Sequence, residues 1–284
     1  MTQATHDDEV ARLALEGGLF TQDHLLKSSN ELPGVKYSKR DFLFRAGTWR
    51  GKHQKPAVLQ GDTKLLVIGH SDYSVANVHV DALRLALGRK LRVWASNLSA
   101  TRESTSNFPI GLTNKAMDSP NHRIFGNQSH IVEALEVERF SEPNLYANFT
   151  TATAPKYRDG LLSLMREHSI GRIQSPEVSD AGRVRYLTDM RRHGFVLCPR
   201  GNGIDTCRLF EALSVGAVPV LKRDEAPLWL LEFPELPVIL VESWLDLLTF
   251  KARFLGRSFA PSGATVVSES YWVDKLKSHA SALS

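Results

Sequence analysis

The sequence predicts an α/β fold built from two similar halves. Residues 64–96 and 194–221 each begin with a short apolar run, pass through a polar turn into a segment with helical spacing, and end in a second apolar run. This strand–helix–strand order favours parallel strands in one sheet. The chain has 284 residues, which is enough for two compact domains of this type. We therefore expect two Rossmann-like domains, 1–143 and 144–284.

The first half has few elements with clear patterns. Residues 1–30 are polar and favour one helix, at 8–15. Residues 31–62 mix glycine and proline with aromatic side chains, which predicts loops with short strands around 42–45. The clearer patterns that follow predict a buried strand at 64–69, a helix at 76–87 closed by Gly88, and a strand at 91–96.

Residues 98–129 are rich in serine, threonine, asparagine and glycine, and we expect a long loop there. The second half alternates apolar runs with helical patterns. The predicted elements are, in order, a short helix at 131–138, a strand at 145–149, a helix at 155–167, a helix at 183–192, strands at 195–198 and 218–221 around a central helix, a strand at 236–241, a helix at 244–255 and a terminal helix at 271–279.

The turn between the strand at 195–198 and its helix has the features of an anion site. Backbone N–H groups at a helix start are unpaired and carry the positive end of the helix dipole. Gly201 and Gly203 allow a ligand to approach the backbone closely. Arg200 lies in the turn and Arg208 in the first helical turn, so two guanidinium groups can converge on phosphate oxygens.

Three further polar residues belong to the same segment. Either Asp205 or Thr206 takes the helix N-cap position. Glu211 follows Arg208 by three residues on one helix face, where a carboxylate suits ribose hydroxyls. A diphosphate with a sugar on either side would satisfy these groups together. From spacing alone, a turn without any phosphate ligand is an equally open alternative.

The segment resembles the donor-binding motif of exostosin-like glycosyltransferases. The resemblance rests on the string C-P-R-G-N-G-I-D-T-x-R-L-x-E-A-L-x-x-G-A-V-P-V at residues 198–220, and weaker similarity extends over 145–250. It implies a GT-B fold, with two Rossmann-like domains facing each other across a cleft. The C-terminal domain would hold a nucleotide sugar, and the terminal helix would cross back onto the N-terminal domain. Cys207 departs from the pattern, which has a histidine there, so no imidazole role is expected at this position.

The family pattern also has an arginine early in the helix after the strand at 145–149, and Arg158 matches it. The carboxyl end of that strand faces the same crevice as the turn. A solvated arginine on the helix face is the alternative. The candidate donor-binding residues are Arg158, Arg200, Gly201, Asn202, Gly203, Asp205, Thr206, Arg208 and Glu211. Glu225 and Glu242 also follow strands at this edge, and the sequence does not rank them.

Asp72 is the candidate catalytic base, with His70 as the second candidate. Both follow the strand at 64–69, whose end points into the crevice between the halves. A transferase that forms a glycosidic bond by direct displacement needs a base to take the proton of the acceptor hydroxyl. The alternative is that Asp72 caps the turn or the following helix.

The sequence contains no Asp-x-Asp triplet, the pattern with which metal-dependent sugar transferases commonly bridge a metal to the donor diphosphate. Arg158, Arg200 and Arg208, together with the helix dipole, can neutralise the leaving group instead. We therefore expect metal-independent transfer. No metal site and no cofactor are predicted, since the nucleotide sugar is a substrate.

The charge and cysteine content narrow the choice of partners. A net charge of +4 suits an anionic donor, or loose attachment to an acidic membrane surface. The sequence has no dense Lys/Arg tract with interleaved aromatic residues, so it gives no indication of nucleic-acid binding. Cys198 and Cys207 suit neither a disulfide nor a zinc site. The polar N-terminus and the absence of a long apolar run predict a cytoplasmic protein, peripheral to a membrane at most.

The sequence thus favours a glycosyltransferase that moves a sugar from a nucleoside diphosphate sugar to a glycan or polysaccharide acceptor. The resemblance implies inversion at the sugar carbon. Two alternatives remain open: a non-catalytic protein that binds a nucleotide or phosphosugar, and a sugar-nucleotide epimerase of similar architecture. The nucleotide base, the sugar, the acceptor and the oligomeric state do not follow from the sequence, nor does the choice between retention and inversion, since both occur on this architecture.

Overall fold

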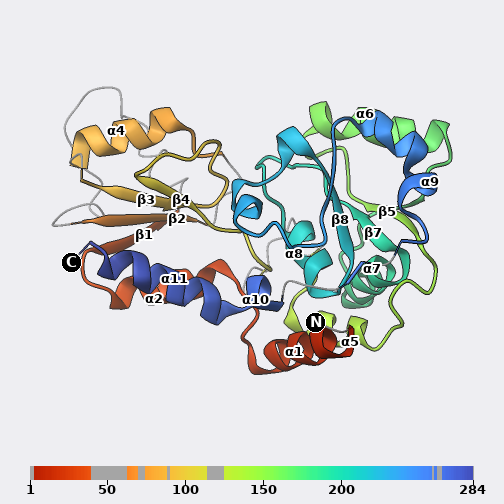
Figure 1. The fold of residues 1–284 in the computed structure, drawn as a ribbon, viewed down its shortest axis with the longest axis horizontal. Coiled ribbons are helices and arrows are strands. Elements are labelled where there is room, and N and C mark those ends of the chain that lie inside the picture. The colour runs from red at the N-terminus through yellow and green to blue at the C-terminus, as the bar shows by residue number, and fades with distance from the viewer. Residues whose placement is uncertain are drawn as a thin grey trace.

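The protein is α/β, with two separate parallel sheets (Figure 1). The computed structural model describes residues 3–39, 63–69, 74–87, 90–113, 125–257, 259–260 and 264–283. Every strand pairing within either sheet is parallel. The predicted fold class is confirmed at this level.

The first sheet has four strands in chain order: β1 (Val35–Lys39), β2 (Leu65–Gly69), β3 (Arg92–Ala95) and β4 (Thr105–Asn107). Helix α4 (Asn77–Leu87) lies on one face, and α2 (Gln22–Glu31) and α11 (Glu269–Ser281) lie on the other (Figure 1). Strand β2 is buried along its whole length because its side chains alternate between two apolar clusters. Leu66 and Ile68 pack with the α4 side, and Leu65 and Val67 pack with the opposite side.

The second sheet has five strands in the order β6–β5–β7–β8–β9. Their bounds are β5 (Asn144–Asn148), β6 (Arg172–Gln174), β7 (Gly194–Leu197), β8 (Val218–Lys222) and β9 (Ile239–Val241). The chain moves outward from β5 to β6 and then returns past β5 to β7, so its direction of winding reverses between β5 and β7. In doubly wound sheets, ligands bind outside the carboxyl ends of the strands at this switch point.

Helices cover both faces of the second sheet. Helix α6 (Pro155–Glu167), the 3-10 segment η4 (Trp244–Thr249) and α9 (Phe250–Phe254) pack on one face. Helices α7 (Asp180–His193) and α8 (Cys207–Ser214) pack on the other. The remaining short segments are η2 (Arg223–Glu225), η3 (Leu228–Glu232) and α10 (Ala264–Val267).

Each end of the chain packs beside the sheet formed by the other half of the chain. Helix α1 (Gln3–Glu16) packs on α5 (Gln128–Leu135), which in turn packs on α7 beside the second sheet. The Asp7 carboxylate forms an ion pair with Arg191 of α7 at 2.7 Å. Helix α11 packs on α2, and its His279 ring stacks on Trp94 of β3 with centroids 5.6 Å apart. One apolar cluster contains residues of both sheets. The boundary between 143 and 144 stays a prediction.

Most predicted elements are present within a few residues of their expected bounds, and α6 has the predicted bounds. The prediction missed α2, β1, β4 and β6, which are polar or very short. The helix expected at 244–255 is wrong in type over its first half, where η4 is 3-10. The strand expected around 42–45 lies outside the described residues.

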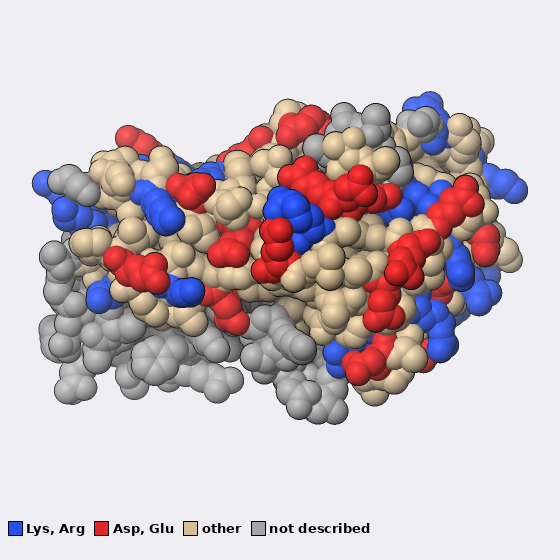
Figure 2. Space-filling view, turned by 90° about the horizontal axis from the view of Figure 1, so that it is seen from below, with Lys and Arg blue, Asp and Glu red and all other residues tan. Residues whose placement is uncertain are grey.

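The surface carries both signs of charge. On the face shown in Figure 2, acidic and basic side chains are interspersed over both halves. Within the described part of the chain, no helix is long and apolar enough to cross a membrane.

Candidate functional site

The loop after β7 enters α8 at the carboxyl edge of the second sheet, beside the switch point. Thr206 is the N-cap of α8, with extended backbone angles of φ −139° and ψ 146°. Of the two residues predicted for this position, Thr206 therefore holds it and Asp205 does not. The Thr206 side chain makes no capping hydrogen bond. The first turn of α8 thus lacks the side-chain acceptor that a cap residue commonly supplies.

Arg208, in this first turn, is buried with unused donors. Only 3% of the residue is exposed. Its Nε and Nη1 atoms have no hydrogen-bond partner within the described structure. Its Cζ atom lies 5.6 Å from the centre of the Phe149 ring. An unsatisfied buried donor costs about 1–3 kcal/mol, and more when it is charged. The site therefore presents a cation whose donors an external acceptor can satisfy.

Arg158, near the start of α6, lies on the same ring. Its Cζ atom is 5.5 Å from the centre of Phe149, and the residue is 5% exposed. Its Nε donates to the Arg200 carbonyl at 3.0 Å and its Nη1 to the Thr150 carbonyl at 3.1 Å. Burial, and then the charge of Arg208, lower the pKa of Arg158 to about 9. An anion between the two guanidinium groups would relieve this repulsion.

The glycine turn packs against this pair. A Cβ atom at Gly201 would stand 3.2 Å from Nη2 of Arg158. The Gly201 N–H donates to the Gly203 carbonyl at 3.1 Å, which closes the turn and leaves Asn202 exposed at its tip. A side chain at position 201 would therefore crowd the Arg158 guanidinium group, a protein contact that the sequence did not predict.

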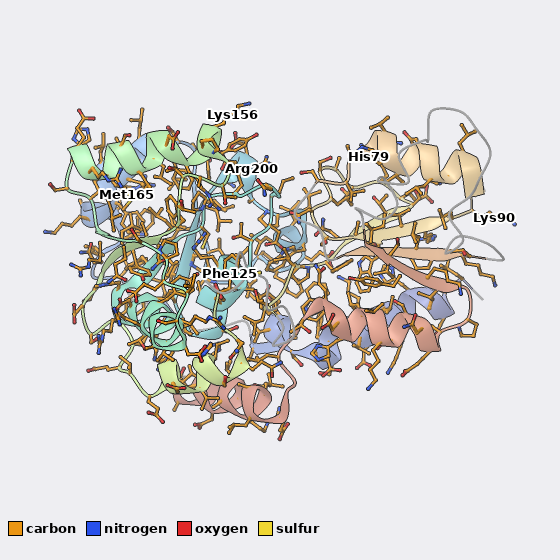
Figure 3. The ribbon with its side chains drawn as sticks, turned by 180° about the vertical axis from the view of Figure 1, so that it is seen from behind. His79, Lys90, Phe125, Lys156, Met165 and Arg200 are labelled. Carbon is orange, nitrogen blue, oxygen red and sulfur yellow. The ribbon has the colours of Figure 1, made fainter. Side chains whose placement is uncertain are left out.

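Arg200 points to a different ring. Its Cζ atom lies 4.3 Å from the centre of the Tyr157 ring, a cation–π distance. Its Nε atom is buried and has no hydrogen-bond partner in the described chain. That Arg200 and Arg208 converge on phosphate oxygens stays a prediction. The structure places Arg208 and Arg158 near one ring, and Arg200 at the wall of a groove. Figure 3 shows Arg200 and Lys156 at the same end of α6.

The groove has a volume of about 660 Å³ and lies between α6 and the segments that follow β8 and β9. Its size is within the usual range of small-molecule sites. Basic, acidic and aromatic side chains all line it. The lining residues are Lys156, Tyr157, Gly160, Leu161, Ser163, Leu164, Glu167, Arg200, Lys222, Asp224, Glu225, Ser243, Trp244 and Leu245.

Asp205 is fully engaged by protein donors. Its Oδ2 atom accepts from the Ile110 N–H at 2.8 Å and from Trp229 Nε1 at 2.9 Å, and its Oδ1 atom accepts from the Thr206 N–H at 2.8 Å. Its own N–H donates to Asn97 Oδ1 at 2.7 Å. Burial raises the pKa of Asp205 to about 6. This predicted donor-binding residue joins the glycine turn to segments that follow β3 and β4.

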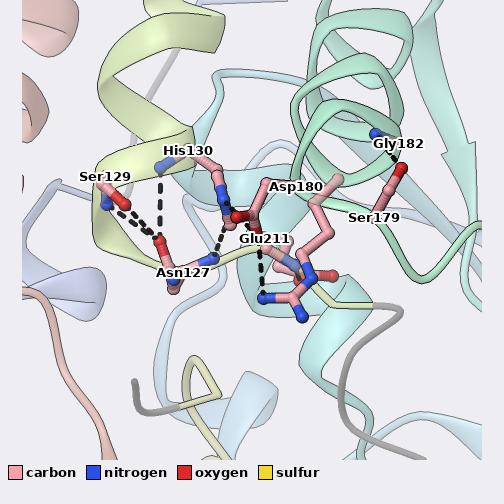
Figure 4. Close-up of polar contacts among 9 residues, drawn as sticks. Asn127, Ser129, His130, Ser179, Asp180, Gly182 and Glu211 are labelled. Carbon is pink, nitrogen blue, oxygen red and sulfur yellow. Dashed lines mark hydrogen bonds and ion pairs between the residues drawn. The ribbon is translucent and has the colours of Figure 1, made fainter. Parts of the chain in front are cut away.

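Glu211 is also occupied. Its carboxylate accepts from the Gly126 N–H at 2.7 Å and from the Tyr186 hydroxyl at 2.8 Å. The residue is fully buried, which raises its pKa to about 7. Figure 4 shows Glu211 between α7 and the start of α5, where Asn127 accepts from the Ser129 and His130 N–H groups. In this structure Glu211 joins α8 to α7 and to the segment that precedes α5, although it was predicted to bind ribose hydroxyls.

Phe149 and Tyr157, the rings that lie beside the three arginines, were not among the residues predicted from the sequence. The available signal was position, since Phe149 directly follows β5 and Tyr157 lies in the first turn of α6. Both predicted catalytic residues, Asp72 and His70, lie outside the described residues. Cys198 and Cys207 are buried and free. The described residues contain no cluster of three or more histidine, cysteine or acidic residues suited to a metal ion.

The family model described as RXYLT1 C-terminal domain matches residues 169–254. The matched segment begins two residues after the end of α6 and runs through β7, the glycine turn and α8 to the end of α9. The family is xylosyltransferase-like and related to the exostosins, and the match supports a glycosyltransferase-like chain. No curated protein matches the chain significantly.

Proposed function

We propose that the chain is a glycosyltransferase of the GT-B type that takes its sugar from a nucleoside diphosphate sugar. The match over residues 169–254 supports a glycosyltransferase-related chain. Two parallel sheets are compatible with the two-domain arrangement that a GT-B fold requires. The second sheet supplies the donor site and the first half supplies the acceptor side of the reaction.

The buried pair Arg158 and Arg208 carries this proposal. Both guanidinium groups lie near the Phe149 ring, and Arg208 has two donors without partners in the described structure. Burying such cations is costly unless an anion pairs with them. The start of α8 adds the positive end of a helix dipole. The Glu211 carboxylate lies close enough to Arg208 to raise the pKa of its guanidinium group, but it does not satisfy Nε and Nη1. A diphosphate has the oxygen atoms that these two donors lack, and further negative charge for Arg158.

The proposed reaction is a single displacement with inversion. The acceptor hydroxyl oxygen attacks the anomeric carbon while the bond from that carbon to the diphosphate oxygen breaks. The electron pair of the broken bond stays on the diphosphate, where Arg158, Arg200 and Arg208 balance its charge without a metal ion. The hydroxyl proton passes to a base, for which Asp72 is the first candidate and His70 the second. The acceptor is a glycan or polysaccharide.

Replacement of Arg208 tests the donor site. Wild-type protein is heated with UDP, GDP or dTDP, with EDTA and with Mn²⁺, and the ligand that raises the melting temperature is then titrated by calorimetry. Arg208→Ala should weaken its binding by at least about tenfold, because each hydrogen bond to a charged group contributes about 1.5–3 kcal/mol. Arg200→Ala tests a second, half-buried arginine and should also weaken binding of the nucleotide.

Arg185→Ala is the matched control, since Arg185 is exposed and paired with Glu177 away from the groove. It should bind like wild type. Circular dichroism checks that each variant is folded. Wild-type affinity in a folded Arg208→Ala protein would contradict the proposal, as would an absence of nucleotide binding by the wild type. Sugar transfer to an acceptor, rather than binding alone, separates the enzyme from a non-catalytic binding protein.

A further inference from the structure

The groove beside Arg200 has two walls. One wall is a stripe along α6, from Lys156 to Glu167, and the other is formed by η2 and the start of η4. Arg200 stands at the end next to the glycine turn, and its backbone N–H lies near the Glu225 carboxylate. A molecule whose phosphate lies at the turn can therefore extend into this groove.

Glu225 carries an unused acceptor at this place. The residue lines the groove and is 8% exposed, and its Oε2 atom has no hydrogen-bond partner within the described chain. Its Oε1 atom lies 3.7 Å from Lys222 Nζ. Burial raises its pKa. A buried carboxylate oxygen without a donor is costly, and vicinal hydroxyl groups of a ligand would satisfy it.

Gly160 leaves the α6 wall open. A Cβ atom built at this position meets no other atom within 4 Å. Glycine in a helix interior is destabilising relative to alanine, and no packing neighbour requires it here. The missing side chain widens the groove opposite the partly exposed ring of Trp244. A planar ring can enter between them.

We propose that this groove binds the nucleoside of the donor, with the ribose hydroxyls on Glu225 and the base beside Trp244. Glu225, rather than Glu211, then serves as the hydroxyl-binding carboxylate, because both Tyr186 and Gly126 already donate to Glu211. This inference rests on the proposed donor site, and it assigns the part of that site that distinguishes a nucleotide from a bare diphosphate.

The test compares UDP, GDP and dTDP with inorganic pyrophosphate by calorimetry on the full chain. Wild type should bind at least one nucleotide tenfold or more tightly than pyrophosphate. Gly160→Trp should remove this advantage and leave pyrophosphate binding within twofold, because the indole fills the groove and not the glycine turn. Glu225→Gln should weaken nucleotide binding and spare pyrophosphate. Asp159→Trp is the matched control, since Asp159 is exposed on α6 and does not line the groove.

The outcomes separate this inference from the proposed function. If Gly160→Trp and Glu225→Gln both keep the nucleotide advantage, the nucleoside lies elsewhere and the inference is overturned. A wild type that binds pyrophosphate and nucleotides equally also overturns it, while the anion site stands. If wild type binds neither, the proposed donor site itself fails. Loss of the advantage in both groove variants, with pyrophosphate binding retained, supports the assignment.

Discussion

The buried carboxylate of Asp205 makes a specific prediction about stability and pH. Its pKa is raised from an ordinary value near 3.8 to about 6 by burial. In the folded protein, Asp205 therefore keeps its proton over a pH range in which the unfolded chain has lost it. The folded state binds more protons between pH 3.8 and 6, so the contribution of Asp205 to the free energy of unfolding falls as pH rises through this window.

The size of the effect follows from the difference of about two pKa units, which corresponds to about 3 kcal/mol over the whole window. Asp205→Asn cannot titrate and removes this dependence. It also removes one acceptor oxygen from a residue that receives three N–H donors, which costs about 1–3 kcal/mol. The variant should be less stable than wild type, and the gap should narrow by about 1 kcal/mol or more between pH 5 and pH 7.

Urea unfolding of wild type and Asp205→Asn at pH 5, 6 and 7 measures this gap, and all other titrating groups cancel in the difference. A gap that stays constant with pH would refute the account of a buried, protonatable Asp205. A gap that widens with pH would show that the Ile110 and Trp229 donors hold the carboxylate ionised instead.

Three further predictions concern groups around the site. Glu211→Gln should remove a second fall in stability, between pH 4.5 and 7, because burial raises the pKa of Glu211 to about 7; urea unfolding across that range measures it, and an unchanged pH profile would count against it. Ala154→Gly should stabilise the protein by about 1 kcal/mol, since Ala154 adopts φ 55° before α6, and a lower melting temperature would contradict this reasoning. Asp7→Ala should cost about 3 kcal/mol in chemical denaturation, because it leaves the buried guanidinium of Arg191 without its counter-charge; a change under about 0.5 kcal/mol would mean that the carbonyl acceptors of Arg191 suffice.

The elements that the sequence predicted well are those whose burial leaves a signal in the local sequence. Strand β2 is apolar without interruption because both of its faces are covered, and α6 combines proline at its start with an apolar face. Strands β4 and β6 have only three residues each and contain polar side chains. Their place is decided by neighbouring strands, which no local pattern reveals.

The location of the glycine turn and of the start of α8 was predictable from the sequence, but their contacts were not. The glycine turn and the start of α8 indicated an anion site at the strand ends, and both lie there. Partner choice depends on tertiary packing. Spacing along α8 suggested that Glu211 faces a ligand, whereas Gly126 and Tyr186 come from distant segments to occupy it. The same is true of Asp205, whose partner Ile110 is 95 residues away in the chain.

The central claim is that Arg208 and Arg158 hold a diphosphate at the start of α8. A crystal structure of the full chain, grown with the nucleoside diphosphate that binds most tightly, tests it directly. The account predicts diphosphate oxygens within hydrogen-bond distance of Arg208 Nε and Nη1, the two donors that lack partners in the described structure. A nucleotide bound elsewhere, with these two donors still unpaired, would contradict it.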